Sequence, residues 1–283
     1  MVSVGTAFYM PPRGWWKGLP QRAVVLTIEG LTLEFDGLHP LTGVSMSVEE
    51  GALAALVGPN GAGKTCVLNC IGGFYTPKAG RIRLDGATIQ GLAPHHIAAR
   101  GIARTFQFVE LFRGMSVLDN ILLGRHRHMR SGVLAGGIFW GRSRREETLH
   151  RRRVEEIIEF LELERHRTEL IASLPFGVQK LVAIGRALAM EPTLLLLDEP
   201  STGMNREEKE NLARFLLRIK HELRTTMLWV EHDMELIGDL ADSVTVLDFG
   251  RKIAEGPPAE VLRDPLVAEA YLGRAYVRER GAG

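Results

Sequence analysis

The sequence predicts an α/β fold organised around a largely parallel sheet. Three short apolar runs, at residues 53–57, 193–197 and 226–230, have the length and composition of strands that are buried on both faces. Residues 206–220, between the second and third runs, repeat apolar side chains with helical spacing. Buried strands that alternate with helices favour parallel pairing, because the helix carries the chain back to the edge where the next strand begins.

Shorter elements are expected around this sheet. Alternating apolar residues predict strands that pair antiparallel ahead of the first buried run, and helical spacing recurs in the middle and at the end of the chain. The predicted strands are residues 25–28, 31–35, 44–48, 80–86, 243–247 and 252–254, and the predicted helices are 94–100, 115–123, 151–163, 178–190, 258–263 and 266–272.

The residues after the first buried run match the phosphate-binding pattern G-x-x-x-x-G-K-T. Glycines allow backbone N–H groups to face phosphate oxygens, and the helix that follows adds the positive end of its dipole. Lys64 is expected to hold the β- and γ-phosphates of a nucleotide, and Thr65 to offer an oxygen to Mg²⁺. A turn that merely joins strand and helix is the alternative, and the complete pattern in this setting disfavours it. The expected nucleotide-binding residues are Gly58, Pro59, Asn60, Gly61, Ala62, Gly63, Lys64, Thr65 and Cys66.

The other two buried runs end on charged residues. Asp198 and Glu199 follow the second run, and Glu231 and His232 follow the third. In an open parallel sheet the ligand lies beyond the carboxyl ends of the strands, where the phosphate-binding loop also lies. Adjacent carboxylates repel each other unless they share a cation or a proton, so a ligand-binding role is favoured over a solvent-facing turn. For His232, the pattern leaves a structural and a catalytic role equally open.

Two groups of aromatic residues each have two interpretations. Phe35 precedes an Asp-Gly turn, so its ring either stacks on a purine base or fills the core. Phe106, Phe108 and Phe112 surround Gln107, and they either form the core of a subdomain or present an apolar pocket to another protein.

Composition limits the classes of function. The 283 residues include 35 basic and 34 acidic side chains, and a net charge of +1 provides no general field that would attract nucleic acid. Cys66 and Cys70 are too few for a disulfide framework or a zinc site, and no apolar run reaches the roughly 20 residues of a membrane-spanning helix. The basic residues between 125 and 153 are interpreted as solvated helix faces in preference to a phospholipid or nucleic-acid contact.

The ordered motifs resemble those of the nucleotide-binding subunits of ABC transporters over residues 24–273. The family's motifs are matched by Phe35 (adenine-stacking aromatic), 58–65 (Walker A loop), Gln107 (glutamine of the loop between core and helical subdomain), 194–199 (Walker B with its glutamate), 201–205 (D-loop) and His232 (switch histidine). The resemblance implies a P-loop NTPase fold with a RecA-like core, an antiparallel β-subdomain and an α-helical subdomain inserted at about residues 108–189. Residues 1–23 are then expected to form a mobile extension, and 274–283 a C-terminal tail.

The resemblance also implies roles for these residues with ATP and Mg²⁺. Glu199 would orient and polarise the attacking water, with His232 and Gln107 as the other catalytic residues. Thr65, Gln107 and Asp198 would organise the Mg²⁺ ion.

Within the family, the chain is most similar to the ATPases that drive import of branched-chain and other hydrophobic amino acids. Segments 104–107, 111–113, 120–122, 231–234 and 270–273 carry this likeness. It implies two membrane permease subunits, a second ATPase subunit that is identical or different, and a periplasmic or extracellular binding protein as partners, with no nucleic acid. The chain would then lie peripherally on the cytoplasmic face of the plasma (inner) membrane.

One motif departs from the family pattern L-S-G-G-Q. The residues at this position are Leu174, Pro175, Phe176, Gly177 and Val178. In the family they contact ATP held by the opposite subunit, and Pro175 offers neither a hydroxyl nor an N–H. A nucleotide-dependent regulatory module with weak or no hydrolysis is therefore the alternative function, although Glu199 and His232 argue against it.

Overall fold

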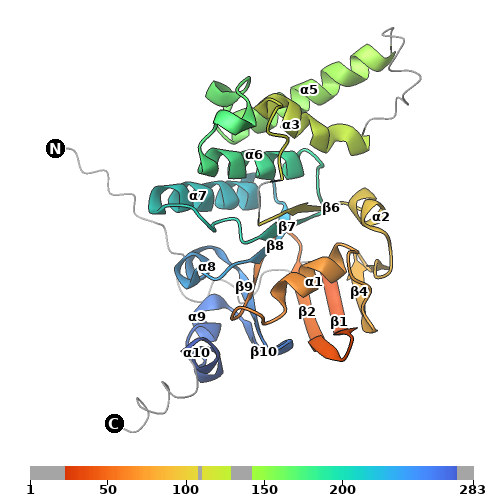
Figure 1. The fold of residues 1–283 in the computed structure, drawn as a ribbon, viewed down its shortest axis with the longest axis vertical. Coiled ribbons are helices and arrows are strands. Elements are labelled where there is room, and N and C mark those ends of the chain that lie inside the picture. The colour runs from red at the N-terminus through yellow and green to blue at the C-terminus, as the bar shows by residue number, and fades with distance from the viewer. Residues whose placement is uncertain (1–22, 108–109, 129–141, 273–283) are drawn as a thin grey trace, which may run out of the picture.

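A computed structural model describes residues 23–107, 110–128 and 142–272 of the chain. Its centre is a six-stranded sheet in which five strands are parallel and the edge strand β10 is antiparallel to β9 (Figure 1). The strands in spatial order are β10 (Arg251–Gly256), β9 (Ser243–Asp248), β3 (Leu53–Val57), β8 (Thr226–Val230), β7 (Leu194–Asp198) and β6 (Ile102–Thr105). The predicted α/β class with a parallel sheet is confirmed.

The buried strands of this sheet divide their side chains between two apolar cores. In β3, Leu53, Ala55 and Val57 belong to one core, whereas Ala54 and Leu56 belong to the other. Strands β7 and β8 alternate in the same way. Because both faces are covered, each strand is a continuous apolar run without a polar face.

A second sheet of four antiparallel strands lies beside the first, in the order β2-β1-β4-β5. Its strands are β1 (Val24–Phe35), β2 (Leu38–Glu49), β4 (Ala79–Leu84) and β5 (Ala87–Thr88). The prediction of two separate strands at 25–28 and 31–35 is wrong, because β1 runs through both. Gly30, with φ of 58°, lies where the register with β2 shifts, so the irregularity is absorbed without ending the strand.

Helices cover the two sheets and extend beyond one end of the larger one. Helix α1 follows β3 and lies against both sheets, while α3, α5 and α6 form a group at the far end of the molecule (Figure 1). The helices are α1 (Lys64–Ile71), α2 (Pro94–Ala99), α3 (Val117–Leu123), α5 (Arg142–Phe160), α6 (Phe176–Leu188), α7 (Arg206–Glu222), α8 (Met234–Leu240), α9 (Pro258–Val261) and α10 (Pro265–Leu272), with short 3-10 helices at Gly124–His128, Glu164–His166 and Ile171–Ser173. No helix in the described part of the chain combines the length and hydropathy that crossing a bilayer requires.

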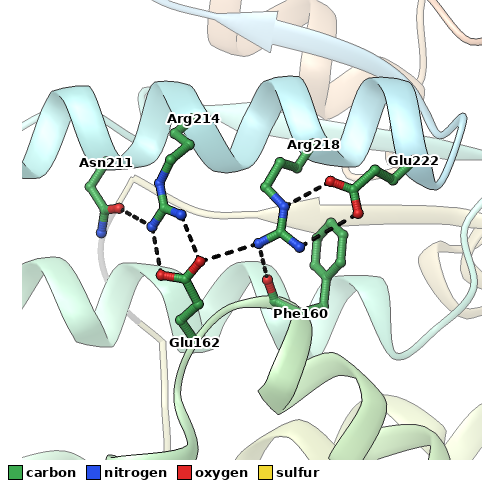
Figure 2. A network of polar contacts seen from close by, with 6 residues as sticks. All are labelled: Phe160, Glu162, Asn211, Arg214, Arg218 and Glu222. Carbon is green, nitrogen blue, oxygen red and sulfur yellow. Dashed lines mark hydrogen bonds and ion pairs between the residues drawn. The ribbon is translucent and has the colours of Figure 1, made fainter. Parts of the chain in front are cut away.

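A polar network joins the end of α5 to α7 (Figure 2). Arg214 donates from both terminal nitrogens to the Glu162 carboxylate, at 2.6 and 2.7 Å. Arg218 donates to the carbonyl oxygen of Phe160 at 2.8 Å and lies 4.5 Å from the centre of the Phe160 ring. These contacts fix the orientation of α7 relative to the segment that leaves α5.

Some predicted boundaries differ from the structure. Helix α5 begins at residue 142, nine residues before the predicted start, and β6 was not predicted as a strand. Helix α3 begins after Ser116, whose hydroxyl accepts the N–H of Asp119 at 3.1 Å and caps the first turn. Four predicted features lie wholly or partly outside the described residues. They are the mobile extension (except Ala23), the aromatic residue Phe108, much of the basic insert, and the C-terminal tail.

Candidate nucleotide-binding site

The glycine-rich loop connects β3 to α1, and Lys64 is the first residue of that helix. The side chain is buried, and Nζ donates to the carbonyl oxygens of Gly58 at 2.6 Å and Pro59 at 3.0 Å. Burial lowers the pKa of Lys64, although the negative charges of Glu199, Asp198 and Glu231 oppose this shift. The lysine therefore lies close to the carboxylates that follow β7 and β8.

Neighbouring backbone dictates glycine at two positions of this loop. Gly58 has φ of 149°, and a Cβ atom there would lie 2.2 Å from the carbonyl oxygen of Leu247 in β9. Gly63 has φ of 99°, and its Cβ would lie 2.7 Å from the carbonyl oxygen of Pro40 in β2. Both positive φ angles also disfavour any side chain. The loop is thus held between the two sheets.

Asp198 is the last residue of β7, and its carboxylate is almost fully buried. Arg104 from β6 donates to Asp198 Oδ2 at 2.7 Å through one terminal nitrogen, and to Asn69 Oδ1 at 2.7 Å through the other. The exposed fraction of the side chain is 9% for Arg104 and 7% for Asp198, so water screens this ion pair weakly.

Glu199 projects from the turn after β7, with an unusual positive φ of 44°. Its N–H donates to the carbonyl oxygen of Val230 at 2.9 Å, which fixes the backbone between β7 and β8. Glu199 Oε2 accepts a hydrogen bond from Gln107 Nε2 at 2.9 Å and another from the Thr202 hydroxyl at 3.3 Å. Two predicted site residues, Gln107 and Glu199, are therefore in direct contact.

His232 lies on the surface next to a buried acid. Its side chain is 54% exposed, and Nδ1 lies 3.3 Å from Oε1 of Glu231. Glu231 is fully buried and accepts hydrogen bonds from the Ser201 hydroxyl at 2.6 Å and from the N–H of His232 at 2.9 Å. Within the described part of the chain, no hydrogen bond or ion pair joins His232 to Lys64 or Glu199. The structure therefore places the histidine beside the site with its ring toward solvent.

The aromatic residues divide between surface and partly buried positions. Phe35 ends β1 with 41% of its surface exposed and lies edge-on to Tyr75, with ring centres 5.0 Å apart. This excludes the core interpretation and leaves an aromatic face at the edge of the antiparallel sheet. Phe106 packs against Phe74 with ring centres 6.4 Å apart, and Phe112 is 59% exposed.

The residues at the start of α6 depart from the family pattern at Pro175, Phe176 and Val178, whereas Leu174 and Gly177 match it. Leu174 is buried and Val178 packs against the core, whereas the rings of Pro175 and Phe176 are exposed. The N–H of Gly177 donates to Glu208 Oε1 at 3.2 Å, so a carboxylate from α7 already caps this helix end. Because Leu174 and Val178 pack in or against the core, their side chains do not line this surface.

The oxygen donors at the site fit a magnesium ion that is bound together with phosphates. Thr65 is exposed on the first turn of α1. Among the described residues, hydrogen bonds occupy Asp198 Oδ2 and Gln107 Nε2, and leave Asp198 Oδ1 and Gln107 Oε1 open. The described residues contain no cluster of three or more His, Cys, Asp or Glu that could hold a metal. Mg²⁺ usually takes one or two carboxylates and completes its shell with phosphate and water, and the Asp198 carboxylate and the Gln107 carbonyl are oxygen donors of this kind.

Three contacts at the site were not anticipated from the sequence. They are the Arg104 ion pair with Asp198, the Glu208 cap on Gly177, and Lys180, whose Nζ donates to the carbonyl oxygen of Gln107 at 2.6 Å. Burial lowers the pKa of Lys180. Each contact joins residues far apart along the chain. For Arg104 and Lys180 the only available signal was a charged residue inside an otherwise apolar segment, whereas Glu208 lies in a run of charged residues and gave no such signal.

Comparison with known proteins shows which family the sequence matches. A family model described as ABC transporter matches residues 41–202, and one described as branched-chain amino acid ATP-binding cassette transporter matches residues 251–277. The chain is 39% identical to the high-affinity branched-chain amino acid transport ATP-binding protein BraF of Pseudomonas aeruginosa, over 89% of this chain and 98% of that protein. It is 35% identical to the protein of the same description named LivG in Escherichia coli strain K12, with the same coverage.

Two solved structures share the fold of the chain. One is a nucleotide-free ATP-binding cassette from an ABC transporter, with a TM-score of 0.77 and 31% identity over 89% of this chain and 100% of that one. The other is the ADP conformation of MJ1267, an ATP-binding cassette of an ABC transporter, with the same TM-score and identity over 89% and 99% of the two chains. The chain therefore belongs to the ABC transporter family, as an ATP-binding subunit that hydrolyses ATP to drive transport.

Proposed function

We propose that this chain is the ATP-hydrolysing subunit of an importer for branched-chain or other hydrophobic amino acids. The observation that supports hydrolysis most strongly is the position of Glu199, which is held by Gln107 and Thr202 at the edge of the sheet that carries Lys64. The cargo is inferred from the similarity to BraF and LivG over 98% of their length.

Lys64 and the loop amides bind the triphosphate in this proposal. Nζ of Lys64 is bonded to the carbonyl oxygens of its own loop, and a β- or γ-phosphate would replace them as the stronger acceptor. Phosphoryl transfer to water requires positioning and charge stabilisation more than covalent chemistry, so a fixed cation at this point lowers the barrier. The exposed ring of Phe35 provides a stacking surface for adenine at the edge of the antiparallel sheet.

Thr65, Asp198 and Gln107 would hold Mg²⁺, Asp198 through a water molecule. When bound, the ion neutralises charge on the β- and γ-phosphates. Arg104 fixes one oxygen of Asp198, and the other oxygen would face the ion.

Glu199 orients and polarises the attacking water, because its carboxylate is the acceptor that projects from the end of β7 into the site. Gln107 keeps this carboxylate in place through the hydrogen bond at 2.9 Å. His232 would turn from its exposed position to brace the γ-phosphate and the region of Glu199.

The proposed assembly contains two membrane permease subunits, a second ATPase subunit and a binding protein outside the membrane, with this chain on the cytoplasmic face. The side chains of Leu174 and Val178 are buried in the core or packed against it, so Pro175 and Phe176 would face ATP on the opposite subunit, and the N–H of Gly177 would do so only if it exchanged its bond with Glu208 for a phosphate oxygen. Phe106, Phe108 and Phe112 form the proposed groove for a helix of the membrane subunit.

Substitution of Glu199 by Gln tests the hydrolytic assignment. We expect Glu199→Gln to retain ATP binding and to reduce phosphate release by a factor of about 10² to 10⁴, the usual contribution of a general base. Lys64→Ala should instead lose nucleotide affinity. Phosphate release and equilibrium ATP binding should be measured on the chain alone and with its membrane subunits.

Glu207→Gln is the matched control, because Glu207 is an exposed glutamate on the first turn of α7. Hydrolysis at the normal rate by Glu199→Gln would refute the role of Glu199. Tight ATP binding by the unmodified complex without any phosphate release would support a regulatory nucleotide-binding module instead.

A further inference from the structure

Arg104 makes a buried contact that the proposed hydrolysis does not require. Its guanidinium group lies between two elements: one arm donates to Asp198 Oδ2 at the end of β7, and the other to Asn69 Oδ1 on α1, each at 2.7 Å. A single side chain from β6 therefore connects the helix after the phosphate-binding loop to the carboxylate at the end of β7.

The position of the guanidinium group is set by aromatic side chains. The carbon at its centre lies 4.9 Å from the ring centre of Phe106 and 5.9 Å from that of Phe74. Attraction between a cation and aromatic faces is stronger where water is excluded, and the Arg104 side chain is only 9% exposed. The planar fork of arginine suits two acceptors at fixed positions, which the single ammonium group of a lysine does not.

The charges near Asp198 make such a partner necessary. Asp198 is followed by Glu199. The carboxylates of Asp198 and Glu231 both lie near enough to Lys64 to raise its pKa, against the lowering by burial. Lys64 directs its hydrogen bonds to Gly58 and Pro59. Within the described residues, Arg104 is thus the side chain that hydrogen-bonds the buried Asp198 carboxylate. Burial of a carboxylate without a hydrogen-bond partner is unfavourable, so the contact with Arg104 holds Asp198 in one orientation.

We propose that Arg104 is a positioning residue for the ATPase reaction: together with Asn69, it fixes Asp198 Oδ2 so that Oδ1 faces magnesium-bound ATP. This inference rests on the proposed function, because it takes Asp198 as the carboxylate that organises Mg²⁺. It assigns to β6 a role in aligning the phosphate-binding helix with the end of β7. Residues that hydrogen-bond to a metal-binding carboxylate act in this way, because they hold the carboxylate in one orientation.

The test measures the affinity for an ATP analogue that carries a fluorescent methylanthraniloyl group, in excess Mg²⁺ and in EDTA. The ratio of the two dissociation constants isolates the contribution of Mg²⁺ without any turnover. We expect Arg104→Ala to reduce this ratio by a factor of about 10 to 100, the range found when a partner of a metal ligand is removed. The dissociation constant in EDTA should stay close to the wild-type value.

Three further variants separate positioning from folding. Arg104→Lys keeps the positive charge but loses the two-armed guanidinium group, so its ratio of dissociation constants should lie between those of Arg104→Ala and wild type. Asn69→Ala should lower the ratio, and its effect should not add to that of Arg104→Ala. Arg100→Ala is the control, because Arg100 is exposed and donates to the carbonyl oxygen of Thr88. If Arg104→Ala does not fold, as judged by circular dichroism, Arg104→Lys and Asn69→Ala decide the question.

Each outcome has one meaning. A wild-type ratio in Arg104→Ala with reduced thermal stability would show that Arg104 has only a structural role, and would overturn the inference. An increased ratio would show that Arg104 competes with Mg²⁺, which also overturns it. If the unmodified chain itself shows no effect of Mg²⁺, the proposed function fails before the role of Arg104 is reached.

Discussion

Glu199 and the glycines of the phosphate-binding loop adopt backbone conformations that few residue types tolerate. Glu199 has φ of 44°, and such a conformation in a residue other than glycine costs of order 1–3 kcal/mol. The hydrogen bond from its N–H to Val230 holds the backbone in this state at the edge between β7 and β8. In this conformation the carboxylate accepts hydrogen bonds from Gln107 and Thr202.

Replacement of Gly58 by Ala tests how tightly this loop is enclosed. The new Cβ would lie 2.2 Å from the carbonyl oxygen of Leu247, so the loop or β9 must move. Gly61→Ala is the matched control, because Gly61 also has a positive φ, of 82°, but no heavy atom lies within 4 Å of its Cβ position.

We expect Gly58→Ala to lower the melting temperature of the nucleotide-free protein clearly more than Gly61→Ala does. Both variants carry backbone strain, which is greater at φ of 149° than at 82°, and the clash adds overpacking of about 1–3 kcal/mol to Gly58→Ala alone. Differential scanning fluorimetry measures both variants. Equal melting temperatures would contradict the enclosure of Gly58 by β9.

The sequence allowed Lys64, Asp198 and Glu199 to be assigned to one site, because each follows an apolar run that ends at the same edge of a parallel sheet. It gave no indication of the partners of Asp198 and Gly177. Arg104 and Glu208 reach these positions through side chains of other elements. Such contacts depend on the packing of the elements, which local patterns do not contain.

The helices and strands show where periodicity is sufficient for a prediction. Strands β3 and β8 have the predicted bounds, since uninterrupted apolar runs mark strands that are buried on both faces. The early start of helix α5 was not predicted, because residues 142–150 are mostly charged and lack an apolar repeat. Strand β6 has only four residues and contains Arg104, so no pattern distinguished it.

The contact between α5 and α7 predicts a dependence on pH (Figure 2). Hydrogen bonds from Arg214 lower the pKa of Glu162 below its ordinary value of 4.5. A carboxylate with a lowered pKa in the folded state stabilises the fold above its unfolded pKa, and this contribution is lost as the pH falls through the folded value. The side chain is 52% exposed, so the effect is small, about 0.2–1 kcal/mol.

Glu162→Gln should therefore lower the melting temperature slightly at neutral pH and have no effect once the pH falls through the lowered pKa. Glu164→Gln, at a nearby exposed position, should have no effect at either pH. Thermal melts of the three proteins across the acidic range measure this difference. A difference between wild type and Glu162→Gln that grows on acidification would contradict the assigned ion pair.

The arrangement of the whole molecule brings distant residues together. Strands β3, β8 and β7 are neighbours in space although they are far apart in the chain, so the phosphate-binding loop, His232 and the pair Asp198 and Glu199 follow adjacent strand ends. The sequence predicted parallel strands but not their order. Spatial order depends on which crossovers pack together, and the helical repeats do not specify this.

The outer surface predicts where the membrane subunits bind. Phe112 is 59% exposed and belongs to the proposed groove, so Phe112→Cys in a background without the native cysteines should form cross-links with a membrane subunit. Leu266→Cys on α10, at an equally exposed apolar position, should not. Cross-linking is measured in the reconstituted complex. Failure of Phe112→Cys to cross-link in an otherwise active complex would contradict the groove.

We propose that Lys64, Asp198 and Glu199 surround one triphosphate. The most direct measurement is a crystal structure of the Glu199→Gln variant grown with ATP and Mg²⁺. We expect density for the β- and γ-phosphates against the N–H groups of residues 58–65 and against Lys64 Nζ, with the ion near Thr65 and Asp198. An empty loop at ATP concentrations that saturate binding in solution, or nucleotide bound elsewhere on the chain, would contradict it.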